Sequence, residues 1–190
     1  MYKRQDRVLC TVPLTVLDKI NFSPALSSEK QTAMNGGFRY APATRIYIQF
    51  NNRFWENESL NGWGNTDLPE EIWQPSWDMT GNTGVLMSYL RWSAAEDMDT
   101  LNQDERNNAV LNRWENIFEG SINNFDKGVS KSWVLDEWSK GAWASPTTSQ
   151  NETLNESIAQ TEGRIHFAGE HASNDRGWMQ GALFSGLRAA

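Results

Sequence analysis

The C-terminal part of the chain carries the pattern that most restricts its fold. Residues 163–171 read Gly-Arg-Ile-His-Phe-Ala-Gly-Glu-His, and residues 177–182 read Gly-Trp-Met-Gln-Gly-Ala. The apolar run 165–168 predicts a buried strand, Gly169 predicts a turn, and residues 178–190 predict a helix. The free N–H groups at the start of such a helix can approach an anionic or electron-rich ligand. This part of the chain therefore predicts a strand, a turn and a helix that together can receive a cofactor.

Length, charge and cysteine content exclude several classes of function. With 190 residues the chain can form one domain with a core, or parts of two. A formal net charge of −7 argues against nucleic acid or an anionic membrane as a partner, because phosphate contacts need clustered Lys and Arg. No apolar run is long enough to predict a transmembrane helix. One cysteine and two histidines predict no internal disulfide and no metal site, and Cys10 is expected to be an inert buried thiol.

The first residues and the tryptophan content also bear on the fold. Residues 1–5 carry two basic side chains without an apolar segment after them, so they do not indicate a secretory signal, and we exclude them from the fold. The sequence assigns no cellular compartment.

Ten tryptophans need burial or a ligand to stack on, so we expect most of them in the core and one or two at a ligand.

Alternating strand and helix signals predict a mixed α/β chain. Strands are expected at residues 6–12, 44–50, 84–92, 131–135 and 165–168. Helices are expected at residues 27–35 with Ser28 as the cap, from Asn102 to Gly120 with a capping box to Glu105, and at 178–190. Residues 51–81 are expected to form a long loop, residues 151–161 a polar surface, and the acidic run 96–99 a solvated helix end.

Several segments, taken in order, resemble the FAD-containing amine oxidases, a family that includes monoamine, polyamine and L-amino-acid oxidases. They are residues 6–14, residues 20–26 (I-x-F-x-P-x-L), the strand at residues 45–55, the loop at residues 133–143 (W-x-x-[DE]-x-[YW]-x-x-G-x-[YW]) and the C-terminal run. One such motif alone is weak evidence. The ordered set is specific and covers nearly the whole chain from about residue 6 onward.

This resemblance implies a part of a FAD/NAD(P)-binding Rossmann-like domain together with a mixed-sheet substrate domain flanked by helices. Residues 1–18 would hold the leader and a strand returning from the FAD-binding domain. Residues 19–135 would form the substrate domain, and residues 136–190 the C-terminal part of the FAD-binding domain. No G-x-G-x-x-G follows a strand in this sequence, so the adenine half of FAD is expected to need an N-terminal domain outside it.

The resemblance also implies a set of residues that contact the cofactor. They are Gly169, Glu170, Gly177, Trp178, Met179, Ala182 and Trp133. Glu170 matches a carboxylate that accepts hydrogen bonds from the ribityl–pyrophosphate arm of FAD; the alternative is a carboxylate that binds a backbone N–H group. The N–H group of Met179 matches one that points at the flavin C2 carbonyl, where the helix N-terminus stabilises the reduced, anionic flavin.

Trp143 and Trp178 match two aromatic positions that flank the substrate amine above the flavin, and the alternative for each is packing in a core. Two indoles in that arrangement exclude water and orient the amine for hydride transfer. Trp133 and Trp138 are expected to form the walls of this site.

Three departures from the family pattern bear on the chemistry. Arg45 stands where the family commonly has a Lys near flavin N5, and an Arg cannot act as a proton shuttle. Rapid reaction with oxygen is therefore less assured, and a different electron acceptor is open; an alternative is a strand Arg paired with a surface carboxylate. Ala142 stands where mitochondrial-type members carry the Cys that binds FAD covalently, so FAD is expected to be non-covalent. The Arg that binds the substrate carboxylate in amino-acid oxidases has no counterpart here.

The expected function is thus that of a FAD-dependent amine oxidoreductase acting on an amine or an L-amino acid. The imine product would hydrolyse to a carbonyl compound and ammonia, and oxygen would return as hydrogen peroxide. This segment by itself is expected to be inactive. The alternatives are a desaturase or protoporphyrinogen-oxidase-like flavoenzyme, which would not need paired aromatics, and a fragment that binds nothing.

Overall fold

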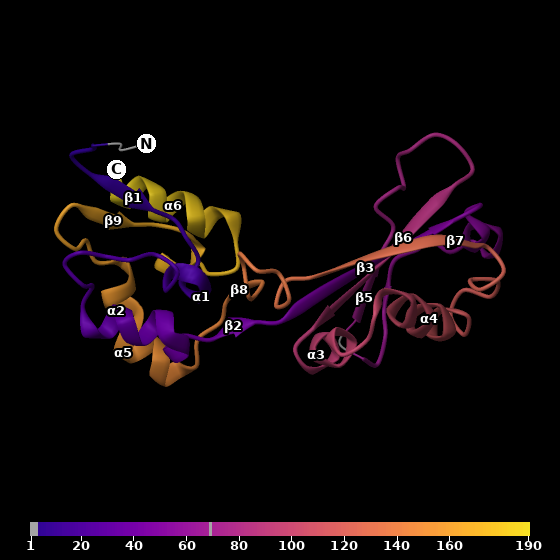
Figure 1. Ribbon diagram of the computed structural model, residues 1–190. Helices are drawn as coiled ribbons and strands as arrows, with labels where there is room; N and C mark the ends of the chain where they lie inside the picture. Colours follow the sequence, from indigo (N-terminus) through magenta and orange to yellow (C-terminus); the bar gives the residue numbers. More distant parts are fainter. Residues whose placement is uncertain (1–3, 69) are drawn as a thin grey trace. The chain divides into compact units, whose positions relative to one another are not determined.

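The computed structural model describes residues 4–68 and 70–190, so part of the expected leader, residues 1–3, lies outside the described residues. The chain divides into two compact units (Figure 1). The first, here called the discontinuous unit, holds Met1–Ala41 and Asp136–Ala190, and the second, the central unit, holds Pro42–Leu135. One division between the two units falls after Leu135. Residues 19–41 pack with the C-terminal residues, because Leu26, Ala33 and Phe38 belong to the same core cluster as Phe167.

The discontinuous unit combines two small sheets with short helices. β1 (Val8–Cys10) runs parallel to β9 (Ile165–Phe167), and β2 (Tyr40–Ala41) runs antiparallel to β8 (Trp143–Ala144). Its helices are α1 (Leu14–Leu17), α2 (Ser28–Thr32), a π-helical turn (Ala33–Gly37), α5 (Thr148–Ala159), a 3₁₀ turn (Glu170–Ala172) and α6 (Met179–Ala189). The predicted strand at 165–168 and the predicted C-terminal helix are both present.

A buried lysine ties α2 to the turn that precedes β9. The Lys30 side chain is fully buried, donates to the carbonyl oxygen of Gln160 at 2.7 Å and pairs with Glu162 at 3.2 Å. Its ammonium lies 3.4 Å from the centroid of the Phe167 ring. Burial lowers the pKa of Lys30, and the Glu162 carboxylate opposes this shift. The same carboxylate accepts hydrogen bonds from the N–H and hydroxyl groups of Ser27, the residue that caps α2 in place of the predicted Ser28.

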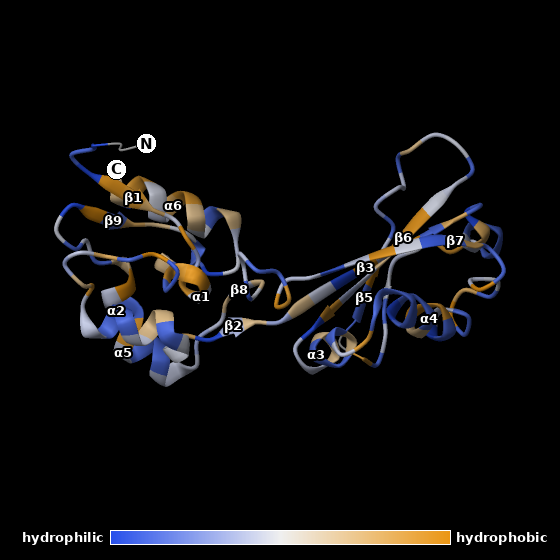
Figure 2. Ribbon diagram, in the orientation of Figure 1, coloured by the Kyte–Doolittle hydropathy of each residue, from blue (hydrophilic) through white to orange (hydrophobic). Residues whose placement is uncertain are grey.

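The central unit is an antiparallel sheet with helices over one face. Its strand order is β4-β5-β6-β3-β7, with bounds Gly64–Asn65, Glu70–Trp73, Gly84–Arg91, Ala43–Phe50 and Phe125–Ser132. The 3₁₀ turn Phe54–Glu58 follows β3, and α3 (Ser93–Asp99) and α4 (Gln103–Trp114) complete the unit. Side chains alternate across β3, so Ile46, Ile48 and Phe50 join the helices in the core while Arg45 and Tyr47 lie on the other face. Figure 2 shows both hydrophobic and hydrophilic segments along the strands of this sheet.

Several predicted elements differ from those observed. The mixed α/β class is correct, and so are the strands near residues 44–50 and 84–92 and the capping box between Asn102 and Glu105. The last strand of the sheet, β7, lies at Phe125–Ser132 and not at 131–135. Its polar sequence has no apolar run that would predict a strand, and its pairing with β3 is what makes it one. The long loop contains β5, and the polar residues near 151–161 form α5.

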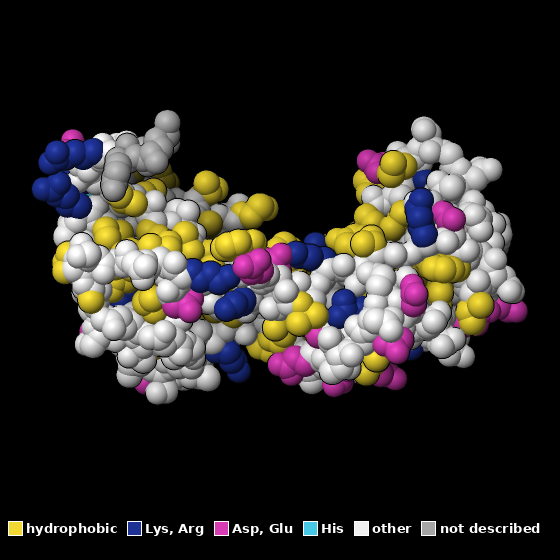
Figure 3. Space-filling view, viewed as in Figure 1, with side chains coloured by type: hydrophobic (Ala, Val, Ile, Leu, Met, Phe, Trp, Pro, Cys, Tyr) yellow, Lys and Arg dark blue, Asp and Glu magenta, His cyan; other side chains and the backbone are white. Residues whose placement is uncertain are grey.

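The expectation that most tryptophans lie in the core is wrong for the described residues. Trp55 and Trp114 are fully buried. The exposed tryptophans are Trp63, Trp77, Trp92, Trp133, Trp138 and Trp178. Other large apolar side chains on the discontinuous unit are exposed as well, among them Leu183 and Leu187 of α6, and hydrophobic side chains are accordingly visible at the surface in Figure 3.

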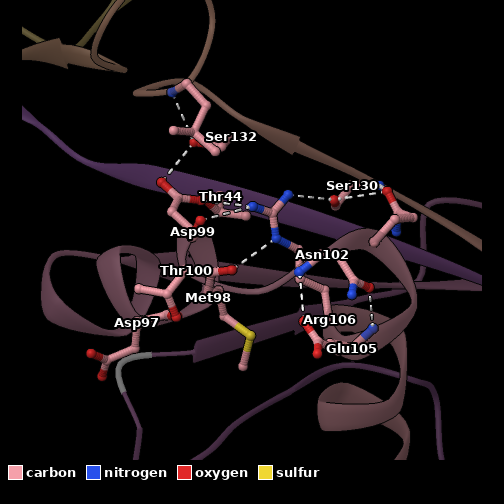
Figure 4. A network of polar contacts seen from close by, with 12 residues as sticks. Thr44, Asp97, Met98, Asp99, Thr100, Asn102, Glu105, Arg106, Ser130 and Ser132 are labelled. Atoms are coloured by element: carbon pink, nitrogen blue, oxygen red, sulfur yellow. Dashed lines mark hydrogen bonds and ion pairs between the residues drawn. The ribbon is translucent and has the colours of Figure 1, made fainter.

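A polar network fastens the helices of the central unit to its sheet (Figure 4). Asp99 accepts hydrogen bonds from the hydroxyl groups of Thr44 on β3 and Ser132 on β7, each at 2.7 Å. Arg106 of α4 lies 3.7 Å from the Asp99 carboxylate and donates to Ser130 of β7 at 3.0 Å. Asp99 is therefore an anchor of the sheet, and the expectation of a solvated helix end is wrong at this position because these strands supply its partners.

Replacing Arg106 with Met should destabilise the central unit by about 3 kcal/mol, because it leaves the half-buried Asp99 carboxylate without its cation. Lys127→Met, on an exposed side chain of β7, is the matched control and should change stability by less than about 0.5 kcal/mol. Urea denaturation of the two variants measures both values, and equal midpoints would contradict the structural role of the network.

Candidate functional site

The two predicted aromatic positions of the discontinuous unit lie on segments that pack against each other. Trp143 lies in β8, and Trp178 is the N-cap of α6. Gly177 has a positive φ of 75°, and a Cβ built on it would lie 3.2 Å from Cδ1 of the Trp143 indole. A glycine is required there both for the backbone conformation and for the close approach of the indole. The structure therefore brings Trp143 next to the residue that precedes Trp178.

Glu170 joins the same two segments. Its Oε1 accepts a hydrogen bond from the N–H group of Ala144 at 2.9 Å, and its Oε2 accepts one from the N–H group of Gly177 at 2.8 Å. Of the two roles that the sequence left open for Glu170, the binding of backbone N–H groups is present in this structure. An ionised carboxylate has about four lone-pair positions, so further acceptor capacity remains.

Gly169 and Ala182, two other predicted cofactor positions, are connected through a serine. The N–H group of Gly169 donates to Oγ of Ser185 at 2.8 Å, and the Ser185 hydroxyl donates to the carbonyl of Ala182 at 2.7 Å. Gly169 has a φ of 132°, and a Cβ there would lie 2.5 Å from the His171 ring. Sequence reasoning missed Ser185, although it is a hydroxyl residue within an otherwise mostly apolar helix.

The N-terminus of α6 is open to a ligand. Trp178 makes no side-chain capping hydrogen bond, and its side chain is 71% exposed; that of Met179 is 79% exposed. The first N–H groups of a helix have no partner within the helix, and its positive end favours an anion. The backbone N–H group of Met179 can therefore donate a hydrogen bond to an electron-rich ligand.

Arg176 holds the loop before Trp178 against α5. Its guanidinium donates to Oδ1 of Asn151 at 2.9 Å and to Oδ1 of Asn155, and lies 5.4 Å from the Phe38 ring centroid. Burial lowers the pKa of Arg176, and the Glu170 carboxylate opposes that shift. Sequence reasoning missed Arg176 too, since a single Arg in a polar loop gives no signal of its partners.

Arg45 and Trp133 belong to the central unit. The Arg45 guanidinium lies 4.7 Å from the centroid of the Tyr89 ring and 5.9 Å from that of Trp73, and its Nε is buried without a hydrogen-bond partner among the described residues. Trp133 is 36% exposed and lies 5.3 Å from the ammonium of Lys131. Arg45 thus lies against aromatic rings, and among the described residues it forms no ion pair with a surface carboxylate.

Within residues 4–68 and 70–190, no group of three or more His, Cys, Asp and Glu side chains could hold a metal ion. Over the same residues, no helix is long and apolar enough to cross a membrane.

The buried His171 makes stability depend on pH. Its side chain is buried, and burial, assisted by Arg176, lowers its pKa to about 4, below the ordinary value of 6.5. The unfolded chain therefore binds more protons at this position between pH 4 and 6.5, so stability rises with pH through that window.

Lowering the pH from 6.5 to 4 should reduce the free energy of unfolding by about 3 kcal/mol through this group. Denaturation of His171→Gln should show that much less dependence on pH than the parent, and an unchanged slope in His171→Gln would contradict the assignment.

Comparisons with known proteins identify the family of the chain. The family model described as flavin containing amine oxidoreductase matches residues 2–190. An L-amino-acid oxidase of Siganus canaliculatus is 33% identical over 193 residues, which cover 97% of this chain and 36% of that protein. An L-amino-acid oxidase of Naja atra is 32% identical over 177 residues, which cover 90% of this chain and 35% of that protein.

Solved structures share the fold. Putrescine oxidase bound to putrescine matches with a TM-score of 0.81 at 19% identity, over 96% of this chain and 41% of that one. Cyclohexylamine oxidase from Brevibacterium oxydans IH-35A matches with a TM-score of 0.77 at 18% identity, over 96% of this chain and 40% of that one. The chain thus spans less than half the length of each of these relatives, and the mixed α/β architecture is that of the amine oxidases. The chain belongs to the family of flavin-containing amine oxidoreductases.

Proposed function

We propose that this chain is part of an FAD-dependent oxidoreductase that oxidises the C–N bond of an amine or an L-amino acid. The observation that supports it most is the packing of Trp143 against Gly177, directly beside Trp178 and the open N-terminus of α6. FAD, when bound, supplies the acceptor for a hydride, and the resulting imine hydrolyses to a carbonyl compound and ammonia. Oxygen as the final acceptor gives hydrogen peroxide.

The residues of the discontinuous unit fit such a cofactor. Gly169 and Gly177 have positive φ angles and no Cβ, so the His171 ring and the Trp143 indole can lie against the backbone at the turns that lead to α6. The helix N-terminus adds N–H donors with a positive end, which suits a ring that becomes electron-rich on reduction. Ala142 offers no thiol for a covalent bond, so the proposed attachment is non-covalent.

The chain's own side chains have distinct proposed roles. Trp143 and Trp178 flank the substrate nitrogen, exclude water and orient the C–H bond. Glu170 and Met179 serve cofactor binding, through the remaining lone pairs of a carboxylate and through a backbone N–H group. Arg45 places a permanent cation at the position of the family's Lys and cannot relay a proton.

The chain spans only 36% of one relative and 35% of another, so activity is proposed for a complete protein that contains it, and this segment alone is expected to be inactive. The dinucleotide-binding motif is expected in a further N-terminal domain. A desaturase or protoporphyrinogen-oxidase-like activity is the alternative within flavoenzymes, and the position of Trp143 against the residue that precedes Trp178 favours an amine oxidase over it.

The visible spectrum of the complete protein tests the function. We expect bound flavin whose absorbance bleaches anaerobically with an amine or an L-amino acid and returns with air. Trp143→Ala should slow bleaching about 100-fold, because a misplaced substrate loses its alignment for hydride transfer. Trp77→Ala, on an exposed indole without a proposed role in the site, is the control and should keep the parent rate within about twofold. Absence of flavin from the parent would contradict the family chemistry, and full activity of Trp143→Ala would favour the alternative.

A second measurement addresses the electron acceptor. In the parent, reduced flavin should reoxidise slowly in air, since Arg45 cannot relay a proton. Arg45→Lys should accelerate reoxidation about tenfold, within the range of general acid–base effects. Stopped-flow absorbance after substrate reduction measures the rate. Lys131→Arg, also on the central sheet, is the matched control; equal rates in the parent and in Arg45→Lys would remove Arg45 from the oxidative half-reaction.

A further inference from the structure

We infer that Glu170 is a positioning residue whose carboxylate sets the separation of Trp143 and Trp178 by binding the backbone next to each indole. This inference rests on the proposed function for the role of the two indoles. It assigns Glu170 a task in addition to any contact with a cofactor.

The first half of this clamp lies at an edge of the sheet formed by β2 and β8. On one side, β8 is held by β2, through Ala142 N–H to the Ala41 carbonyl at 2.9 Å and Ser145 N–H to the Arg39 carbonyl at 2.8 Å. The N–H group of Ala144 points away from β2 and donates to Glu170. Ala144 is 2% exposed, so this donor is buried and needs a partner other than water. The carboxylate thus occupies the second edge of a strand that is only two residues long.

The second half lies in the loop that leads to α6. Gly177 adopts a left-handed conformation, and its N–H group donates to the other oxygen of the same carboxylate. One planar group of fixed size therefore connects Ala144, next to Trp143, with Gly177, next to Trp178. Hydrogen bonds to an ionised acceptor are shorter and stronger than neutral ones, so the connection is a stiff one.

Neighbouring contacts prevent the two segments from adjusting independently. Gly177 packs on the Trp143 indole, and Arg176 fastens the loop to α5 through Asn151 and Asn155. Glu170 itself begins a 3₁₀ turn whose next residue, His171, is buried. The carboxylate is therefore held on a rigid base, and a change in its length or charge has to move the indole-bearing segments.

The test uses the complete flavin-loaded protein and compares Glu170→Gln, Glu170→Asp and the exposed control Glu152→Gln on α5. A glutamine amide presents an NH₂ group to one of the two N–H donors, and an aspartate is one methylene too short to reach both. Both changes should raise the hydrogen-exchange rates of the Ala144 and Gly177 amides about tenfold or more, while Glu152→Gln leaves them unchanged. With a substrate of the parent, kcat should fall about 100-fold with little change in KM.

The Asp variant separates this role from a purely electrostatic one. It retains the negative charge near Arg176 and the cofactor, so normal exchange and normal kcat in Glu170→Asp would overturn the clamp. Unchanged amide exchange in Glu170→Gln would overturn it as well, whatever happens to flavin affinity. If both variants fail to fold while Glu152→Gln folds, Glu170 supports the whole unit and the specific proposal is also overturned. The exchange measurement needs no turnover, so a parent that holds flavin but oxidises no amine would refute the proposed function without deciding the exchange result.

Discussion

The parallel pairing of β1 with β9 is the contact on which the discontinuous unit depends. It joins Val8–Cys10 to Ile165–Phe167, two segments from opposite ends of the chain. Phe167, at the end of β9, packs in the core of this unit beneath α2 and α5. Closing so long a loop costs entropy that only a shared apolar core offsets. Once β9 is fixed, Gly169 turns the backbone and Ser185 receives its N–H group, which places Glu170 and the start of α6. Every proposed cofactor contact of this unit follows from that strand.

Buried charges lock the supporting elements of each unit. Lys30 pairs with Glu162 in the discontinuous unit, and Arg106 pairs with Asp99 in the central unit. Such pairs are needed because an isolated buried charge is costly, and they fix the elements that carry them. Buried Nε atoms without a partner among the described residues occur in both units, at Arg45 and Arg113 of the central unit and at Arg176 of the discontinuous unit. Arg45 and Arg176 also lie beside aromatic rings.

Sequence patterns predicted well those elements whose signal is local. The capping box at Asn102, the β-branched alternation of β3 and the apolar residues 165–168 each specify their structure within a few neighbouring residues. β7 was displaced and β5 was missed, because their polar or mixed sequences become strands only through pairing with β3 and β6. The expected burial of the tryptophans failed for a related reason: residue type predicts a need for contact and does not specify which surface provides it.

For the candidate site, the sequence by itself determined the residue types at the glycine turns, the two indoles and the carboxylate, and with them the family. These depend on local backbone requirements and on motifs that are contiguous in the chain. Only the tertiary structure decided what these residues touch. Gly177 lies against Trp143, and the Glu170 carboxylate bridges Ala144 and Gly177, across separations of many residues. Such contacts form when the core brings distant segments together, so no local pattern encodes them, and the same holds for Ser185 and Arg176.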